Sequence, residues 1–322
     1  MSFRNRDLIS IDDYSPAEAA HVLESAAELK RDPGQVAQLA AGKTLAMIFE
    51  KQSLRTRISF EVAMTQMGGH SIYLQPADIG LGTREPVKDA ARMITRVCDA
   101  IMARTFAHQT VIDLAEFATI PVINALSDQE HPCQALADFL TLREHKGPVA
   151  GLKLAYVGDG NNVAHSLLLL AAKLGTHCSV ACPAGYSPTP AVVARAREIA
   201  RDTGSVIEVG TDPALLLQDA DAVYTDVWTS MGQEAEKADR LAIFPPYQVN
   251  AALLRHARAD ALIMHCLPAH RSEEITDEMM EHPCSVVFDQ AENRLHAQKA
   301  VLALAFGWTP VEASLRVLSV EF

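Results

Sequence analysis

Short apolar runs alternate with amphipathic segments along most of the chain. Residues 43–49 (KTLAMIF) form an apolar run of the length typical of a buried strand. Shortly afterwards, Phe60, Ala63, Met64 and Met67 recur at the spacing of one helix face. Because such alternation favours a parallel sheet covered by helices, we predict an α/β protein.

The alternation forms two series. The first predicts strands at 43–49, 70–74, 99–103 and 121–125, with helices at 86–97, 111–118 and 135–144. The second predicts strands at 152–157, 178–182, 206–209, 222–225, 261–265 and 285–288, with helices at 163–174, 190–201, 213–220, 249–257 and 277–281. Lys146-Gly147-Pro148 interrupts the pattern between them. We therefore predict two domains, 1–147 and 148–290, each a parallel sheet with helices on both faces, and a last helix (291–322) that packs back on the first domain.

The turn after the first predicted strand carries unusual polar chemistry. Ser53 and Thr56 lie where the next helix begins, and a helix N-terminus offers free N–H groups to an anion. Arg55 and Arg57 add forked donors that match phosphate oxygens. A capping serine followed by a solvated arginine face would explain any single motif of this kind. The whole stretch directly after a buried strand favours an anion cradle, without defining a reaction.

Charge and composition narrow the classes of partner. The chain has 322 residues, nearly half of them apolar, and a net charge of −12. This charge argues against general nucleic-acid or membrane binding, so a local cluster of Arg and His is informative. The six cysteines show no C-x-x-C pair, and the N-terminus has no apolar export segment. We expect reduced thiols, a cytoplasmic location and a small anionic ligand.

Four motifs resemble cofactor or metal sites. Gly42-Lys43-Thr44 lacks the upstream glycine of a P-loop and precedes a strand. The turn at 158–160 lacks the third glycine of a dinucleotide site, and no acidic residue ends the next strand. Cys178 and Cys182 alternate with Ser and Ala in a strand, which makes them core side chains rather than zinc ligands. His265, Cys266 and His270 lack a further ligand pair, so we expect neither a metal nor an organic cofactor.

Several motifs occur in an order that resembles a known family. They are S-x-R-T-R, HPCQALADFLT, GDGNN, DVWTSMGQE, HCLP and FDQAENR, and together they extend over nearly the whole chain. In this order they resemble the ornithine carbamoyltransferases. The DVWTSMG and HCLP motifs distinguish these from the related aspartate carbamoyltransferases.

The resemblance implies carbamoyl phosphate and L-ornithine as substrates, transfer of the carbamoyl group to the δ-amine, and a homotrimer with sites near subunit interfaces. It implies catalytic roles for Arg104, His131, Cys266 and Asp226. The residues implied for carbamoyl phosphate are Ser53, Leu54, Arg55, Thr56, Arg104, His131, Gln134, Cys266, Leu267 and Arg294. Those implied for ornithine are Asn162, Asp226, Ser230 and Met231. Within this frame Arg57 supports the turn rather than binding phosphate.

Two positions depart from the family pattern. Leu54 stands where the family usually has Thr, so one hydroxyl contact to phosphate is lost while the backbone donor remains. Gly80 stands where many members place a Gln or His that reaches a neighbouring subunit's site, and Thr83, Arg84 or Lys88 could replace it. The alternatives are a carbamoyltransferase for putrescine or an acylated ornithine, and a non-catalytic binding homologue.

Overall fold

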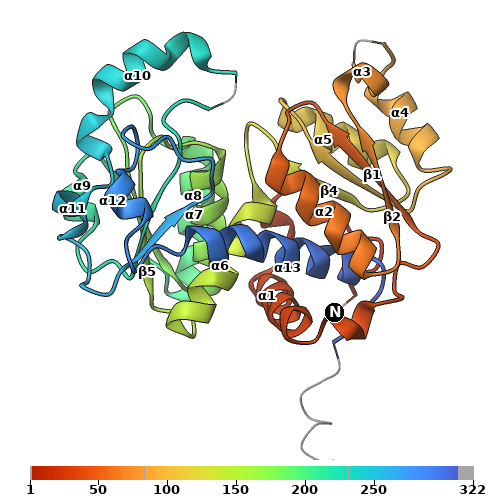
Figure 1. Cartoon of the computed structure of the whole chain (residues 1–322), viewed down its shortest axis with the longest axis horizontal. Coiled ribbons are helices and arrows are strands. Elements are labelled where there is room, and N and C mark those ends of the chain that lie inside the picture. The colour runs from red at the N-terminus through yellow and green to blue at the C-terminus, as the bar shows by residue number, and fades with distance from the viewer. Residues whose placement is uncertain (1, 83, 231, 311–322) are drawn as a thin grey trace, which may run out of the picture.

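Two parallel sheets flanked by helices form the core of the computed structural model, which describes residues 2–82, 84–230 and 232–310. The first sheet has the order β2-β1-β3-β4 and the second the order β7-β6-β5-β8-β9. All strand pairs are parallel. The two halves lie side by side, with most red to orange elements on the right and most green to blue elements on the left, while the blue helix at the C-terminal end of the described chain extends into the right half (Figure 1). The predicted fold class is confirmed.

The strands lie within about a residue of their predicted positions, with one exception described below. The first sheet contains β1 (Thr44–Phe49), β2 (His70–Leu74), β3 (Ala100–Arg104) and β4 (Val122–Leu126). The second contains β5 (Lys153–Val157), β6 (His177–Ala181), β7 (Ile207–Gly210), β8 (Ala222–Thr225) and β9 (Leu262–His265).

The helices and short 3-10 turns connect these strands. In the first half they are η1 (Ile11–Asp13), α1 (Pro16–Arg31), η2 (Pro33–Val36), α2 (Leu54–Gln66), α3 (Pro76–Ile79), α4 (Val87–Ile94), α5 (His108–Phe117) and α6 (Pro132–Lys146). In the second half they are α7 (Asn162–Leu174), α8 (Pro190–Thr203), α9 (Pro213–Leu216), η3 (Glu234–Glu236), α10 (Lys237–Ile243), η4 (Pro245–Tyr247), α11 (Ala251–Leu254), α12 (Asp277–Met280) and α13 (Val287–Ala305). The predicted helices at 213–220 and 249–257 are therefore each reduced to a single turn, and α3 and α10 were not predicted.

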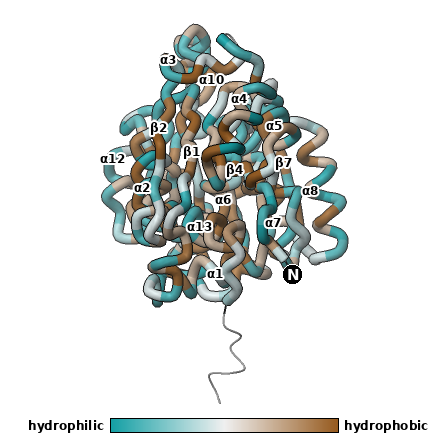
Figure 2. The backbone as a smooth tube through the Cα atoms, turned by 90° about the vertical axis from the view of Figure 1, so that its right-hand side faces the viewer, coloured by the Kyte–Doolittle hydropathy of each residue, from teal (hydrophilic) through white to brown (hydrophobic). Residues whose placement is uncertain are grey.

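Alternate residues of each strand pack against helices on opposite faces. In β1, Leu45 and Met47 join the core beneath α1, α2 and α13, while Ala46 and Ile48 join the core beneath α4 and α5. The second sheet divides its side chains in the same way between α7 and α8 on one face and shorter helices on the other. Helices such as α8 accordingly show alternating hydrophilic and hydrophobic bands (Figure 2).

The predicted strand at 285–288 is wrong. Ser285 makes only an isolated bridge to Ile263, and the chain turns into α13 from Val287. The apolar run was read as a strand, but Val287 is buried while Phe288 is 65% exposed, and the buried positions continue at helical spacing through Gln290 and Arg294. Helix α13 thus begins earlier than the predicted 291. It packs against α1, α2 and α6 and lies across the junction of the two halves (Figure 1).

The predicted boundary at 147/148 falls between α6, which ends at Lys146, and β5, which begins at Lys153. Gly147 adopts a positive φ of 81° there, a conformation that glycine tolerates best. One buried cluster nevertheless continues from the first sheet to the second through α6, α7 and α13. Within the described residues, no helix combines the length and apolar character that crossing a membrane requires.

Candidate active site

The turn between β1 and α2 forms the predicted helix N-terminus. Ser53 is the N-cap residue, and its Oγ accepts a hydrogen bond from the Thr56 backbone N–H at 3.3 Å. Leu54 and Arg55 line a cavity at this turn, and Leu54 is 71% exposed. Thr56 is buried and does not line the cavity; its Oγ1 instead accepts from Arg294 Nη2 at 3.0 Å. The contact with Arg294 of α13 fixes the Thr56 side chain, while Leu54 and Arg55 of the same turn line the cavity.

Arg57 lies outside this group. Its Nε donates to Glu61 Oε1 at 3.0 Å, and its guanidinium lies 4.0 Å from the centre of the Tyr73 ring. Both contacts lie on the side of α2 next to β2, and Arg57 does not line the cavity. Arg57 therefore joins α2 to β2, and its support of the turn stays a prediction.

Three arginines from different elements converge on one end of the cavity. Arg55 comes from α2, Arg104 from the end of β3 and Arg294 from α13, and all three line the cavity. Burial lowers the pKa of each guanidinium. The pKa of Arg104 falls to about 9, through burial and then through the like charges of Arg294 and Arg55, which still leaves it charged at neutral pH. Arg104 Nε is buried without a hydrogen-bond partner in the described part of the chain. Because these like charges repel one another, the cluster favours the binding of an anion.

His131 lies beside these arginines where the chain enters α6. Its backbone N–H donates to Ser166 Oγ at 2.9 Å, which fixes this residue against α7. Burial, together with Arg294, Arg104 and Arg55, lowers the pKa of His131 well below its usual value. The imidazole is therefore neutral and carries one N–H that can donate to a neutral or anionic oxygen.

The opposite end of the cavity is acidic. Asp226 follows β8 and is only 7% exposed, and its Oδ2 accepts from Asn161 Nδ2 at 2.8 Å. Its Oδ1 accepts from the Cys266 thiol at 3.0 Å and from the Val227 N–H at 2.8 Å. Burial and the neighbouring Asp226 raise the pKa of Cys266 well above its usual value. Cys266 is therefore a neutral thiol that donates to Asp226, not a thiolate.

Three further predicted residues line the same end. Asn162 opens α7 and donates from Nδ2 to the Ser127 carbonyl at 2.6 Å. Ser230 lies in the loop after β8, and Leu267 follows Cys266 with a positive φ of 57°. Met231 and Thr83, both named from the sequence, lie outside the described residues.

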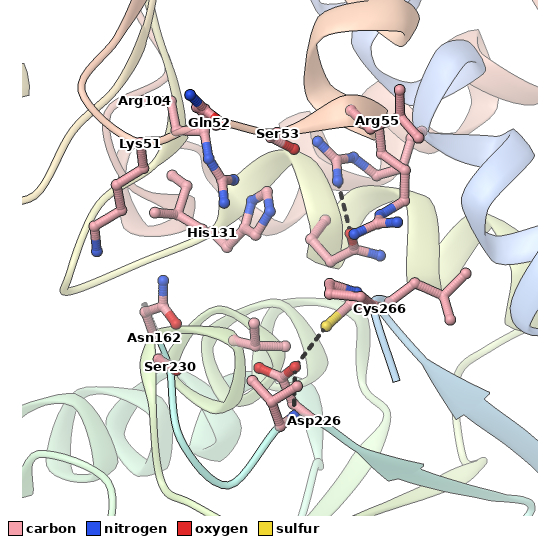
Figure 3. A pocket seen from close by; sticks show the side chains of 18 of the residues that line it. Lys51, Gln52, Ser53, Arg55, Arg104, His131, Asn162, Asp226, Ser230 and Cys266 are labelled. Carbon is pink, nitrogen blue, oxygen red and sulfur yellow. Dashed lines mark hydrogen bonds between the residues drawn. The ribbon is translucent and has the colours of Figure 1, made fainter. Parts of the chain in front are cut away.

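Together these groups enclose a cavity of about 500 Å³ at the carboxyl ends of strands from both sheets. Arg55, Arg104 and His131 face Asn162, Asp226 and Ser230 across it (Figure 3). The predicted residues that line it are Ser53, Leu54, Arg55, Arg104, His131, Gln134, Asn162, Asp226, Ser230, Cys266, Leu267 and Arg294.

Sequence reasoning missed four contributors. Lys51, Gln52 and His270 line the cavity, and Asn161 fixes Asp226 from behind. Lys51 and Gln52 directly precede Ser53 in the sequence, and this proximity could have identified them as residues that line the cavity. Asn161 lies in the GDGNN turn, but only the fold brings it to Asp226.

Among the residues that the structure describes, two groups of potential metal ligands occur near the cavity, Asp226-His265-Cys266 and His270-Glu273-Glu274. In the first group, His265 Nδ1 accepts from the Leu267 N–H at 2.8 Å, and its Nε2 lies 3.0 Å from Glu274 Oε1. Both His265 nitrogens therefore already have protein partners, and they hold the loop that carries Cys266.

The fold and the cavity define an α/β protein with two parallel sheets and a cavity rich in arginine between them, and comparison with known proteins identifies the class. Residues 6–144 match the aspartate/ornithine carbamoyltransferase carbamoyl-P binding domain, and residues 150–305 match the Asp/Orn binding domain of the same family. The chain belongs to the aspartate/ornithine carbamoyltransferase family.

Similar members are named ornithine carbamoyltransferases. An anabolic one from Pyrococcus furiosus is 53% identical over 309 residues, covering 95% of this chain and 98% of the relative. One from Gloeobacter violaceus is 56% identical over 301 residues, covering 94% and 96%. The solved structure of a Pyrococcus furiosus ornithine carbamoyltransferase superposes with a TM-score of 0.93 at 53% identity, covering 96% of this chain and 100% of that one.

Proposed function

We propose that the protein transfers the carbamoyl group of carbamoyl phosphate to the δ-amine of L-ornithine, giving L-citrulline and phosphate. The observation that carries the proposal is the polarity of the cavity, with three arginines at one end and a buried carboxylate at the other. A dianionic donor and a zwitterionic amine acceptor match these two ends. The similar proteins named above carry the same activity in their names.

The arginine end takes carbamoyl phosphate. Ser53, Arg55 and the N–H groups that open α2, including that of Leu54, bind the phosphate, while Thr56 orients Arg294 from behind. Arg104, His131 and Gln134 hold the carbamoyl group. Arg104 brings a buried Nε without a described protein partner, which suits a substrate acceptor. Cys266 and Leu267 close the cavity beside the reacting carbon.

The carboxylate end takes ornithine. Asp226 binds the α-ammonium, since three protein donors leave part of its acceptor capacity unused. Asn162, Ser230 and Met231 bind the α-carboxylate end. The δ-amine then points along the cavity toward the carbonyl carbon held by Arg104 and His131.

The chemistry uses the charges at both ends. The δ-amine has an ordinary pKa of about 10, so roughly one molecule in a thousand is neutral at pH 7. Attack places negative charge on the carbonyl oxygen, and preorganised donors from Arg104 and neutral His131 stabilise it. Phosphate leaves into the arginine cluster and can accept the amine proton, while Asp226 keeps Cys266 protonated and the far end of ornithine fixed.

A citrulline assay with carbamoyl phosphate and L-ornithine tests the proposal. We expect citrulline with ornithine and at least about a hundredfold lower kcat/KM with putrescine or Nα-acetylornithine, since each of these leaves a buried polar group without its partner. Putrescine has no α-carboxylate, and the acylated amine does not pair with Asp226. A protein that binds carbamoyl phosphate but forms no citrulline would instead be a non-catalytic binding homologue.

We further propose a cytoplasmic homotrimer that functions in arginine biosynthesis, with a carbamoyl phosphate domain (1–147) and an ornithine domain (148–290). The anabolic relative and the six cysteines, all free, support the role and the location. Sedimentation should give three times the 34.9 kDa chain mass, and a monomer that retains full activity would contradict the trimer. Replacing Arg84 or Lys88 by Ala and measuring carbamoyl phosphate affinity tests which residue takes the place of the side chain that Gly80 lacks.

A further inference from the structure

The amide of Gln134 is held in one orientation. Gln134 lies in the first turn of α6, is only 1% exposed and lines the cavity. Its Nε2 donates to Asp138 Oδ1 at 2.7 Å, and its Oε1 accepts from Arg294 Nη1 at 2.8 Å. A carboxylate only accepts and a guanidinium only donates, so turning the amide by 180° would break both contacts.

This orientation fixes what Gln134 can recognise. A carbonyl oxygen has two lone pairs, and Arg294 uses one of those on Oε1. The remaining acceptor site can take an N–H from a ligand in the cavity, whereas one of the two N–H groups of Nε2 is engaged by Asp138. The Oε1 atom of Gln134 therefore offers the cavity a hydrogen-bond acceptor. A carbamoyl group has an NH₂ to satisfy this acceptor, and an acetyl group has a methyl group in the same place.

Asp138 holds the Gln134 amide from outside the cavity. It is fully buried one helical turn after Gln134 and does not line the cavity. Gln290 Nε2 donates to the same Oδ1 at 2.7 Å, and Gln290 Oε1 accepts from the His265 N–H at 3.0 Å. Burying a carboxylate costs free energy, and here burial raises the pKa of Asp138 to about 7. A neutral apolar side chain would avoid that cost.

Protonation of Asp138 does not undo the arrangement. Two amide donors already meet Oδ1, and a hydrogen bond from the Tyr224 hydroxyl also acts to lower the pKa of Asp138. A proton on Oδ2 would leave Oδ1 an acceptor for both amides. The Gln134 amide is held the same way on both sides of neutral pH.

We propose that Asp138 is a positioning residue that makes the site select a carbamoyl over an acetyl phosphate, by holding the Gln134 oxygen toward the cavity. The proposal rests on the proposed function only in that carbamoyl phosphate is the donor. It concerns a side chain that never touches the substrate.

Two stable phosphonates test it. Phosphonoacetamide and 2-oxopropylphosphonate differ only in an NH₂ against a CH₃ beside the carbonyl, and calorimetry gives their affinities without turnover. We expect the wild-type protein to prefer the amide at least about tenfold, as one hydrogen bond made in a buried site allows. Asp138→Leu should bring the ratio to within about twofold by weakening the amide alone. Asp138→Asn keeps an acceptor oxygen and should retain the ratio.

Thr141→Val serves as the matched control, because Thr141 is buried one turn further along α6 and contacts Asn293 of α13. It should retain the ratio. Equal weakening of both phosphonates in Asp138→Leu would reveal a purely structural residue and overturn the proposal, as would an unchanged ratio. If Asp138→Leu does not fold, Asp138→Asn decides, since loss of the preference in that variant contradicts the proposal. Absence of citrulline formation by the wild-type protein would overturn the proposed function and leave the ratio test standing.

Discussion

At the scale of single residues, neighbouring charged side chains differ in whether they line the cavity. Arg55 and Arg57 are two positions apart on α2, yet only Arg55 lines the cavity, while Arg57 contacts Glu61 and Tyr73. A helix turns by about 100° per residue, so positions two apart face different directions. The S-x-R-T-R motif therefore contains both an arginine that lines the cavity and a matched control arginine that does not.

Arg55→Ala should raise the KM for carbamoyl phosphate at least about tenfold, because a charged hydrogen bond to phosphate is lost. Arg57→Ala should leave this KM within about twofold of the wild-type value. Steady-state citrulline formation with carbamoyl phosphate as the varied substrate measures both. Near-normal affinity in Arg55→Ala would refute the assignment of the phosphate end.

Between about pH 6 and 7.5 the pH dependence of the rate should reflect the δ-amine of ornithine, because this range lies below the α-amino pKa of about 8 and the Arg104 pKa of about 9. Burial and three arginines lower the pKa of His131 well below its usual value, and burial beside Asp226 raises the pKa of Cys266 well above its own. Log kcat/KM for ornithine should therefore rise with a slope of about 1 across this range. A flat profile, or a second inflection near the ordinary histidine pKa, would contradict this reading of the site.

At the scale of elements, helix caps double as parts of the site. Asn161 is the N-cap of α7, and its Oδ1 accepts from the Val163 and Ala164 N–H groups. The same side chain donates from Nδ2 to Asp226 Oδ2 at 2.8 Å. One residue therefore stabilises a helix with its oxygen and orients the carboxylate with its nitrogen.

Two substitutions separate these roles. Asn161→Ser keeps an N-cap oxygen but has no group that reaches Asp226, so the urea midpoint should stay near the wild-type value while the KM for ornithine rises about tenfold. Asn161→Ala should lose the cap as well, at about 1 kcal/mol of unfolding free energy. A normal ornithine KM in Asn161→Ser would show that the Asn161 donor does not orient Asp226 for binding.

The burial and contacts of individual elements explain which strands, helices and site residues could be predicted from the sequence. Strands such as 43–49 and 222–225 were found because both of their faces are buried, which makes them continuous apolar runs between turns. The run at 285–288 is also apolar, but the chain there turns into α13. Helix α13 contacts α6 and β9, and a local sequence pattern contains no information on such contacts. Arg104 and His131 were found as polar residues at strand ends. Asp138 was not named, although it lies one turn after Gln134, because the contacts that Gln290 and Arg294 make with this pair exist only once α13 reaches α6.

At the scale of the whole molecule, one buried carboxylate joins three distant segments. Glu130 is 1% exposed, and it accepts from Ser10 Oγ and from the Ile11 N–H at 3.0 Å, both in the N-terminal segment. It also accepts from Ser166 Oγ of α7 at 3.1 Å, and Ser166 in turn receives the His131 N–H. Glu130 thus connects the N-terminal segment, the loop that carries His131 and the second half of the chain.

This position makes Glu130 a source of pH-dependent stability. Burial raises its pKa from 4.5 to about 7, although three hydrogen bonds oppose the shift and Asp13 adds to it. Because the folded protein holds this proton more tightly than the unfolded chain, the contribution is fully present below pH 4.5 and is lost as the pH rises through 7. At 1.36 kcal/mol per pKa unit, the loss is at most roughly 3 kcal/mol.

Glu130→Gln removes the titrating group while keeping a buried side chain of the same size. The wild-type protein should lose more unfolding free energy between pH 5 and pH 8 than Glu130→Gln does, by up to roughly 3 kcal/mol in urea titrations at the two values. Asp138 and Asp159, whose pKa values burial also raises, are present in both proteins and cancel in the difference. An equal loss of unfolding free energy in the two proteins would contradict this prediction. It would show that the Glu130 carboxyl has the same pKa in the folded and unfolded chains, so that ionising it does not destabilise the fold.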